Sequence, residues 1–437
     1  MLVRRLSWIK RIIDGSTILL LGALSACDPT GPNETWNGDS AITDSASQDS
    51  RSTDSSCTPG TSTCSTTLAK TIESSLALAV DQYLAMDQQV PDSELPRSTL
   101  PDGTLWTEDT AWWTAGFFPG SLWYLYEYSG AENILIAAMK RTSQVEPEKF
   151  NSSDHDIGFK IQCSFGNQLR LTGDELSEDV IITAADTLMK RFNPTVGCIR
   201  SWGNIDDTSK FTVIIDNMMN LELLFNAARL SGNQDYFNAA VSHADKTLQH
   251  HFRPDHSSYH VVEYDIQTGT PQLKRTAQGY SNESAWARGQ SWGLYGFVVA
   301  YRETGFIRYL EQARNIAHFL LEHPNLPDDG IPYWDYDAPD IPNTWRDASA
   351  AAIMASALIE LSTMTNCADR DFYLRHAQQI LCSLSSPSYR SAINENSHFL
   401  LKHSVGSLPG NSEIDVPLTY ADYYYLEAMT RLRRIKQ

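Results

Sequence analysis

The sequence predicts an all-α protein in which helical hairpins form a closed ring. An apolar helix end, followed by Ser/Thr-Gly and a new amphipathic segment, recurs along the chain, so that about six helix pairs are expected. The strand–helix alternation that builds a parallel sheet is missing from the sequence. Long, aromatic-rich insertions separate the pairs, and they favour a toroid with a pocket at one mouth over an open solenoid.

The repeats follow one another from a first helix near residue 68. Glycine at four junctions and asparagine at a fifth suit the left-handed residue that ends a helix. The five segments are residues 126–139 (YEYSGAENILIAAM), 169–189, 228–248, 301–320 and the weaker copy 362–381, with Gly130, Gly173, Gly232, Gly305 and Asn366 at the junctions. One insertion, residues 259–273 (YHVVEYDIQTGTPQL), alternates like two short strands of a hairpin.

Length and composition are those of a globular protein with a large core. The 437 residues allow one large domain or two or three smaller ones, and 42% of them are hydrophobic. Residues 68–437 are predicted to form one domain. The formal net charge of −19 argues against binding to nucleic acid or to an anionic membrane surface. It leaves room for a small anionic substrate in a locally positive pocket.

The N-terminus has the pattern of an export signal. A basic head that contains Arg4 and Lys10 precedes the short apolar run ILLLGALSA, which is too short to span a bilayer. The run ends in Leu24-Ser25-Ala26-Cys27, which is similar to a bacterial lipobox. We therefore predict a lipoprotein signal peptide at 1–26, lipidation of Cys27, and an exported, membrane-anchored protein, periplasmic or at the cell surface. A plain secretory signal is the alternative.

Residues 27–67 have the composition of a disordered tether, rich in Ser, Thr, Asp, Gly and Pro. Cys57 and Cys64 could close a small disulfide loop in an oxidising compartment. The remaining cysteines, Cys163, Cys198, Cys367 and Cys382, lie in apolar or helical contexts typical of buried side chains. No Cys/His spacing typical of a metal site occurs, so no structural metal is predicted.

Polar and aromatic side chains collect in the insertions rather than in the helices. An apolar run, Val213-Ile214-Ile215, delivers one carboxylate, Asp216, next to Asn217 and Asn220. The other candidates are Trp113 before a helix, His155 and Asp156 before Gly-Phe, Trp202, His260 in the hairpin, and Gln278, Trp286, Arg288 and Trp292 in residues 275–296.

Five blocks in this order resemble the unsaturated glucuronyl hydrolases, glycoside hydrolase family 88. They are HDIGF (155–159), IIDNMMNL (214–221), QGYSNESAWARGQSWGLYG (278–296), PYWDYDAP (332–339) with RDASAAAI (346–353), and YADYYYLEAM (420–429). The resemblance covers roughly residues 70–436. It implies an (α/α)6 barrel, six hairpins in a toroid with the aromatic-rich insertions at one mouth. It also implies removal of the nonreducing-end 4,5-unsaturated uronic acid from oligosaccharides left by polysaccharide lyases, without a metal or an organic cofactor.

The resemblance also assigns roles to residues. It implies that Asp216 is the general acid/base and Asp156 the second essential carboxylate. It places eight residues in the sugar-binding pocket: Trp113, His155, Trp202, His260, Gln278, Trp286, Arg288 and Trp292. We expect Trp113 and Trp292 to be flat platforms for sugar rings, and Arg288 with Gln278 to orient the substrate carboxylate or a hydroxyl.

One carboxylic acid suffices for this chemistry. The C4=C5 bond of an unsaturated uronide is an enol ether, so an acid can protonate C4 and then accept a proton from the water that attacks C5. The acid must keep its proton near neutral pH. The apolar neighbours of Asp216, together with Asp156 brought close by folding, are expected to raise its pKa.

Ordinary structural roles are the alternative for each candidate. Asp216 and Asp156 could be helix N-caps, and Arg288 could pair with Glu283. Because Trp286 and Trp292 are six residues apart, at least one is expected to leave the core. Asp335, Asp337, Arg346 and Asp347 are interpreted as residues that fix loops or form the pocket wall.

Alternative functions also stay open. They are an unsaturated rhamnogalacturonyl hydrolase, which shares the barrel, and a non-catalytic surface glycan-binding lipoprotein. The source polysaccharide and the oligomeric state stay open as well.

Overall fold

The computed structural model describes residues 65–436. The predicted leader, Cys27, Cys57 and Cys64 lie outside the described residues. So does the predicted tether, except for its last three residues, which belong to the first helix.

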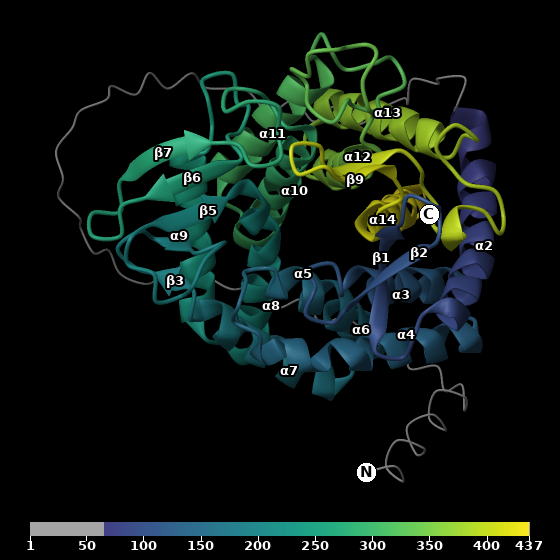
Figure 1. The fold of residues 1–437 in the computed structure, drawn as a ribbon, viewed down its shortest axis with the longest axis horizontal. Coiled ribbons are helices and arrows are strands. Elements are labelled where there is room, and N and C mark those ends of the chain that lie inside the picture. The colour runs from purple at the N-terminus through teal and green to yellow at the C-terminus, as the bar shows by residue number, and fades with distance from the viewer. Residues whose placement is uncertain (1–64, 437) are drawn as a thin grey trace. The chain divides into compact units, whose positions relative to one another are not determined.

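Twelve helical segments in residues 65–436 alternate between an outer and an inner ring, and so form the predicted (α/α)6 barrel (Figure 1). The outer helices are α2 (Ser65–Gln89), α4 (Glu132–Val145), α7 (Glu175–Met189), α9 (Gln234–His250), α11 (Ile307–Leu321) and α13 (Cys367–Leu384). The inner ones are α3 (Phe117–Ser129), the interrupted helix α5 (Ile157–Ile161)–η2 (Gln162–Gly166)–α6 (Asn167–Thr172), α8 (Leu221–Ser231), α10 (Ala287–Thr304), α12 (Ala348–Ser362) and α14 (Thr419–Lys436). The last inner helix packs against the first, α14 on α3, which closes the ring.

The inner helices are apolar around most of their circumference because neighbours cover them on both sides and behind. In α12, ASAAAIMASALIELS, every residue except Glu360 is buried. Small side chains let α12 pack closely with α10, α13 and α14. The core of the domain therefore lies between the two rings, and one end of the inner ring is free to form a pocket.

Glycine ends the helices as the sequence predicts. Gly130, Gly173, Gly232 and Gly305 follow α3, α6, α8 and α10 with φ between 63° and 73°, and each donates its N–H to a carbonyl of the last turn. The prediction for Asn366 is wrong. With φ −66° and ψ 170° it starts α13 instead, because its side chain accepts a hydrogen bond from the N–H of Asp369.

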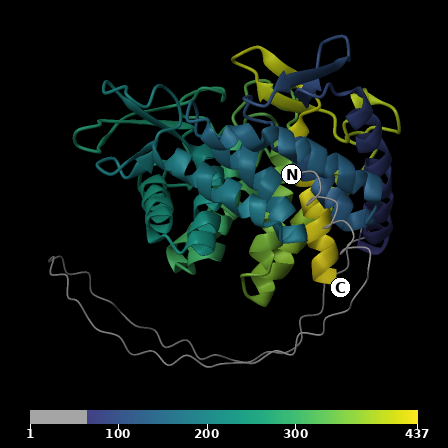
Figure 2. The ribbon, with the colours of Figure 1, turned by 90° about the horizontal axis from the view of Figure 1, so that it is seen from below.

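The insertions carry short antiparallel strands. They form β1 (Glu94–Thr99) with β2 (Leu105–Asp109), β3 (Phe192–Asn193) with β4 (Cys198–Ile199), the order β5 (Phe211–Ile214)–β6 (Val261–Tyr264)–β7 (Pro271–Arg275), and β8 (Ser404–Ser407) with β9 (Ser412–Val416). The hairpin predicted at 259–273 is confirmed as β6–β7. Short helical turns η1 (Glu146–Phe150), η3 (Ile215–Asn220) and η4 (Asn396–His398) complete the elements. In Figure 2 the strands gather at one end of the helices.

Two of the four cysteines in the described part, Cys163 and Cys198, are buried and free. Cys367 and Cys382 are disulfide-bonded. Cys367 opens α13 and is exposed, and Cys382 lies in its last turn and is half-buried, so the expected burial is confirmed only for Cys163 and Cys198. Within residues 65–436, every helix is too short or too polar to cross a membrane.

Candidate active site

The predicted site residues lie where the inner helices begin. Trp113 precedes α3, Asp156 precedes α5, Asp216 lies in η3 directly before α8, and Trp286 and Arg288 lie at the start of α10. The strands gather at this same end (Figure 2). We call this end of the barrel the N-terminal mouth. Helix N-termini carry unsatisfied N–H groups and a partial positive charge, so this mouth suits an anionic ligand.

Asp216 is a buried acid that keeps its proton. Strand β5 brings the chain into the interior, and the side chain of Asp216 in η3 is 14% exposed. Burial raises the pKa of Asp216 to about 7, against the opposing charge of Arg288. Its Oδ2 atom is buried without a hydrogen-bond partner and lies 3.6 Å from Nε2 of His260. This agrees with the predicted rise of the pKa by burial, whereas the predicted contribution of Asp156 is not among its causes.

Asp156 is the second carboxyl of the mouth. Burial raises its pKa well above the usual value, and the negative charges of Asp154 and Asp216 add to the shift. Asn220 joins the two acidic segments: its Oδ1 accepts from the N–H of Phe159 at 2.9 Å, and its Nδ2 donates to Asp156 Oδ1 at 3.4 Å. A Cβ on Gly158 would lie 2.5 Å from this amide, so the glycine of HDIGF makes the contact possible.

Neither carboxylate has the capping role that we considered as an alternative. Asp156 occupies the N-cap position of α5 without a side-chain hydrogen bond to the helix. Asp216 lies inside the first turn of η3, whose N-cap is Ile214. Both side chains are therefore free of the helix ends that they adjoin, which leaves them available for chemistry.

Both histidines are neutral. Burial lowers the pKa of His155 to about 3 and that of His260 well below its usual value. The N–H groups of Ala277 and Gln278 point at Nδ1 of His260, at 3.2 and 3.3 Å. Nδ1 is thus the acceptor, and the ring proton sits on Nε2, facing Asp216. His155 lies with its Nε2 3.3 Å from Asp156 Oδ1, and neither of its ring nitrogens has a hydrogen-bond partner.

Two tryptophans frame His260. Its ring packs at a tilt of 33° on Trp286, with 4.4 Å between centroids, and meets the edge of Trp202 at 5.7 Å. Trp113 is half-buried and rests on Phe159 and Tyr420, with centroids 5.6 and 5.0 Å away. Trp113 and Trp202 keep exposed surface for a sugar ring.

Trp292 is not the platform that the sequence led us to expect. Its side chain is 1% exposed and packs against Phe159 and Tyr424, so that it has no free ring face. The expectation that Trp286 or Trp292 leaves the core is also wrong, because Trp286 is 3% exposed.

Arg288 is buried and bonds to other residues of the protein. It pairs with Asp347 at 3.3 Å, not with Glu283, which lies beside Arg253 instead. It also donates to the carbonyls of Val405 and Gly406 in strand β8. Gln278 donates to the same Gly406 carbonyl at 3.0 Å. These two side chains hold the β8–β9 hairpin in this structure, whereas the sequence predicted that they orient the substrate.

The acidic cluster after residue 334 fixes loops, as the sequence indicated. Asp335 accepts from the N–H of Tyr280 and the hydroxyl of Ser284, and Asp337 accepts from the N–H of Ala285. Asp347 does more, since it caps α12 and neutralises Arg288. The position of Asp347 directly before an alanine-rich helix indicates the cap. Its pairing with Arg288 has no such local signal, because it depends on the closed ring.

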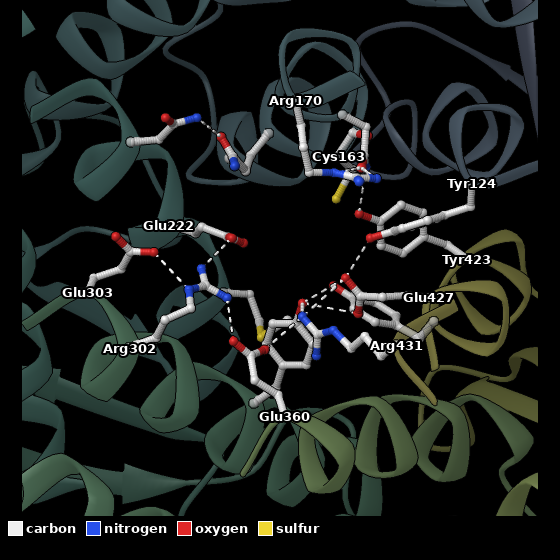
Figure 3. A pocket seen from close by; sticks show the side chains of 18 of the residues that line it. Tyr124, Cys163, Arg170, Glu222, Arg302, Glu303, Glu360, Tyr423, Glu427 and Arg431 are labelled. Carbon is white, nitrogen blue, oxygen red and sulfur yellow. Dashed lines mark hydrogen bonds and ion pairs between the residues drawn. The ribbon is translucent and has the colours of Figure 1, made fainter. Parts of the chain in front are cut away.

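A cavity of about 690 Å³ lies at the other end of the barrel, which we call the C-terminal mouth (Figure 3). Arg288 and Arg302 mark the two ends of α10, about 20 Å apart along the helix, and only Arg302 lines this cavity. Phe159 lines the cavity and also contacts Trp113, so it lies between the two mouths. The cavity does not include Asp156 or Asp216.

Side chains from every inner helix form ion pairs and hydrogen bonds with one another around the C-terminal mouth. The contacts run around the ring as Glu222–Arg302, Arg302–Glu360, Glu360–Arg431, Glu427–Tyr124, Glu127–Arg170 and Gln162–Asn226. Figure 3 shows most of this circle around the cavity. Because the charges of this circle are paired with one another, we assign the circle to stability rather than to chemistry. No group of three His, Cys, Asp or Glu side chains within residues 65–436 is placed to hold a metal ion.

The comparisons with known proteins agree with this architecture. Residues 86–433 match the profile of Glycosyl Hydrolase Family 88. An unsaturated glucuronyl hydrolase of Formosa agariphila is 48% identical over 74% of this chain and 80% of the relative. An unsaturated chondroitin disaccharide hydrolase of Streptococcus pneumoniae is 33% identical over 74% and 82%.

A crystal structure of an unsaturated glucuronyl hydrolase specific for heparin aligns with a TM-score of 0.82 and 46% identity. It covers 84% of this chain and 98% of that one. Since the family profile and these relatives extend over most of the barrel, the chain belongs to glycoside hydrolase family 88.

Proposed function

We propose that this protein is an unsaturated glucuronyl hydrolase, which removes the 4,5-unsaturated uronic acid from the nonreducing end of lyase-generated oligosaccharides. The observation that carries the proposal is Asp216, a carboxyl whose pKa is raised to about 7 and whose Oδ2 has no hydrogen-bond partner of its own. Family membership supplies the reaction class, and its named members include unsaturated glucuronyl hydrolases.

The geometry at the N-terminal mouth suits acid-catalysed hydration. Asp216 donates its proton to C4 of the C4=C5 enol ether, and positive charge then develops at C5 and the ring oxygen. The ionised Asp216 accepts a proton from a water molecule whose oxygen bonds to C5. The resulting hemiketal opens to a ketone at C5 and a hemiacetal at C1, which expels the rest of the saccharide. One water is consumed, and Asp216 regains its proton.

The surroundings of Asp216 support each stage of this cycle. The Nε2–H of His260 lies next to Oδ2 and can stabilise the carboxylate once the proton has left. Asp156, with its strongly raised pKa, is a second neutral carboxyl that can hydrogen-bond to the sugar or to the water. The N-termini of the inner helices converge on the site, and their partial positive charge favours a substrate carrying a carboxylate.

We propose glycosaminoglycan-type oligosaccharides as the substrate class. The relatives point to it, because one acts on unsaturated chondroitin disaccharides and another is specific for heparin, according to their names. The half-buried rings of Trp113 and Trp202 are suited to stacking on sugar rings.

The test measures the loss of the C4=C5 double bond of the substrate. The conjugated alkene of the substrate absorbs in the ultraviolet, and hydration removes that absorbance. Purified protein is incubated with lyase-generated chondroitin, hyaluronan and heparin disaccharides and, separately, with an unsaturated rhamnogalacturonan disaccharide. Loss of absorbance with a uronate–hexosamine disaccharide supports the proposal. Turnover of the rhamnogalacturonan product alone, or binding of the disaccharides without any loss of absorbance, contradicts it.

We also propose that the protein is exported and anchored to the membrane through a lipid on Cys27. The basic head, the short apolar run and the lipobox-like Leu24-Ser25-Ala26-Cys27 support this, as do the disulfide bonds of Cys367 and Cys382, because disulfides persist in oxidising compartments. Labelling with radioactive palmitate in a bacterial host is expected to mark the wild type and not Cys27→Ala. A wild type that stays unlabelled and soluble would refute the anchor.

A further inference from the structure

Two hairpins from opposite ends of the domain lie side by side at the N-terminal mouth. Strand β1 packs against β9, so the β1–β2 hairpin contacts the β8–β9 hairpin. Arg97 of β1 joins them. Its guanidinium forms ion pairs of 2.9 Å with Glu108 of β2 and with Glu413 of β9. We call Arg97 and Glu413 the clasp.

The contacts around Arg97 hold its side chain in one position. It is 7% exposed, and its guanidinium lies between the rings of Trp106 and Trp112, 3.8 and 4.1 Å from their centroids. Such stacking suits the flat guanidinium and not the rounded ammonium of lysine. Trp112 is the neighbour of Trp113, so the clasp adjoins the sugar-binding side of the mouth.

The clasp continues to Arg288 through the β8–β9 hairpin. A Cβ on Gly406 would lie 2.6 Å from Oε2 of Glu413, which means that the carboxylate held by Arg97 packs on the Gly406 backbone. The carbonyl of that same glycine accepts from Arg288 at 2.6 Å and from Gln278 at 3.0 Å. Arg97 is therefore linked to two predicted pocket residues through a single carboxylate and a single glycine.

The hairpin needs such support because its backbone is strained. Asn411, Glu413 and Asp415 have φ of 48°, 55° and 57°, the left-handed region that side chains other than glycine seldom occupy. Strain of this kind persists where surrounding contacts impose it. The ion pair that reaches Glu413 from outside this hairpin comes from Arg97.

We propose that Arg97 is a positioning residue of the active site: through Glu413 it holds the β8–β9 hairpin against Arg288 and Gln278 in the arrangement that binds substrate. The proposal rests on the proposed function for its kinetic consequences. If the hairpin leaves this position, only the ordered fraction binds substrate, and the apparent affinity falls by that fraction. A purely structural role would instead lower the amount of active enzyme, which reduces the apparent kcat and leaves KM unchanged.

The test compares KM in Arg97→Met and Glu413→Gln with that in Arg302→Met. The last variant also removes an arginine from a group of carboxylates, but at the C-terminal mouth. We expect KM to rise about tenfold in both clasp variants and to stay within about twofold of wild type in Arg302→Met. The double variant should resemble either single one, because both break the same link. If Arg97→Met does not fold, Glu413→Gln decides.

Amide hydrogen exchange is a second measurement, which does not require the protein to turn over substrate. Amides of residues 404–416 should exchange at least about tenfold faster in the clasp variants, and at the wild-type rate in Arg302→Met. An unchanged KM together with unchanged exchange in a folded clasp variant overturns the proposal. A wild type inactive on every disaccharide would instead overturn the proposed function, and hydrogen exchange would still decide whether Arg97 holds the hairpin.

Discussion

Replacing Asp216 with asparagine should abolish turnover and, above neutral pH, make the fold more stable. An amide has nearly the shape of the protonated acid but no proton to donate. The stability gain follows from the cost of ionising Asp216 where it is buried. Its pKa is about 7 in the folded protein, against the ordinary value of 3.8 that an exposed aspartate has in the unfolded chain. One pKa unit corresponds to 1.36 kcal/mol, so the full cost is about 4 kcal/mol.

The sign of the effect depends on pH in a defined way. Below about pH 4 the carboxyl is protonated in both states and costs nothing. Between about pH 4 and 7 the unfolded chain releases its proton first, so the free energy of unfolding falls as pH rises. Above about pH 7 the whole cost is present. Asp216→Asn should therefore gain up to about 4 kcal/mol at pH 8 and nearly nothing at pH 4.

Urea denaturation at both pH values measures this gain, and the absorbance assay measures turnover. Asp422→Asn is the matched control, because burial also raises the pKa of Asp422 to about 7. Its oxygens, however, accept from the N–H groups of Leu400 and Leu401 and from the hydroxyl of Tyr83. Asparagine would turn a donor toward these donors, so Asp422→Asn should lose stability at pH 8. If Asp216→Asn is destabilised to the same extent, or retains turnover, the reasoning is refuted.

Three further predictions concern the two mouths. In the wild type, kcat should fall about tenfold per pH unit above about pH 7 as Asp216 ionises, and a pH–rate profile flat to pH 9 would contradict the assignment of the acid. Asp156→Asn should lower kcat by at least about 100-fold while disaccharide binding, measured by calorimetry, persists; equal kcat would remove Asp156 from the reaction. Arg302→Met should lower the free energy of unfolding by about 2 kcal/mol, as measured by urea denaturation. This is less than the loss expected when one partner of a fully buried ion pair is removed, because the side chain of Arg302 is 29% exposed. No loss of stability would show that the C-terminal mouth is not held by its ion pairs.

Local chemistry explains what the sequence could predict. Ser/Thr-Gly after an apolar helix end specifies a left-handed cap by itself, and all four glycines adopt it. The apolar run before Asp216 predicts a buried acid for the same reason, since its neighbours in the chain are also its neighbours in space. Asn366 was mispredicted because an asparagine can both end a helix and begin one, and only the backbone angles distinguish the two.

Contacts between distant segments account for what was missed. Trp292 loses its free faces to Phe159 and to Tyr424, which come from different inner helices. Arg288 reaches carbonyls of Val405 and Gly406, more than a hundred residues away, and nothing near Arg288 in the sequence indicates those partners. These positions depend on the ring being closed.

The closed ring also explains how a strongly acidic protein can bind an acidic sugar. The net charge of −19 repels an anion at long range, but salt screens that repulsion beyond about 10 Å. Within the N-terminal mouth the local charges differ from the overall charge. The N-termini of the inner helices converge there, Asp347 balances the charge of Arg288, and burial raises the pKa of Asp156 and of Asp216, which favours their neutral forms. Burial thus keeps Asp216 able to donate a proton. By favouring the neutral forms of both Asp156 and Asp216, it also removes two negative charges from the mouth that the substrate carboxylate enters. Raising the pH above about 7 should therefore weaken substrate binding as well as turnover, and an increase in KM that parallels the fall in kcat would distinguish this double role from proton donation alone.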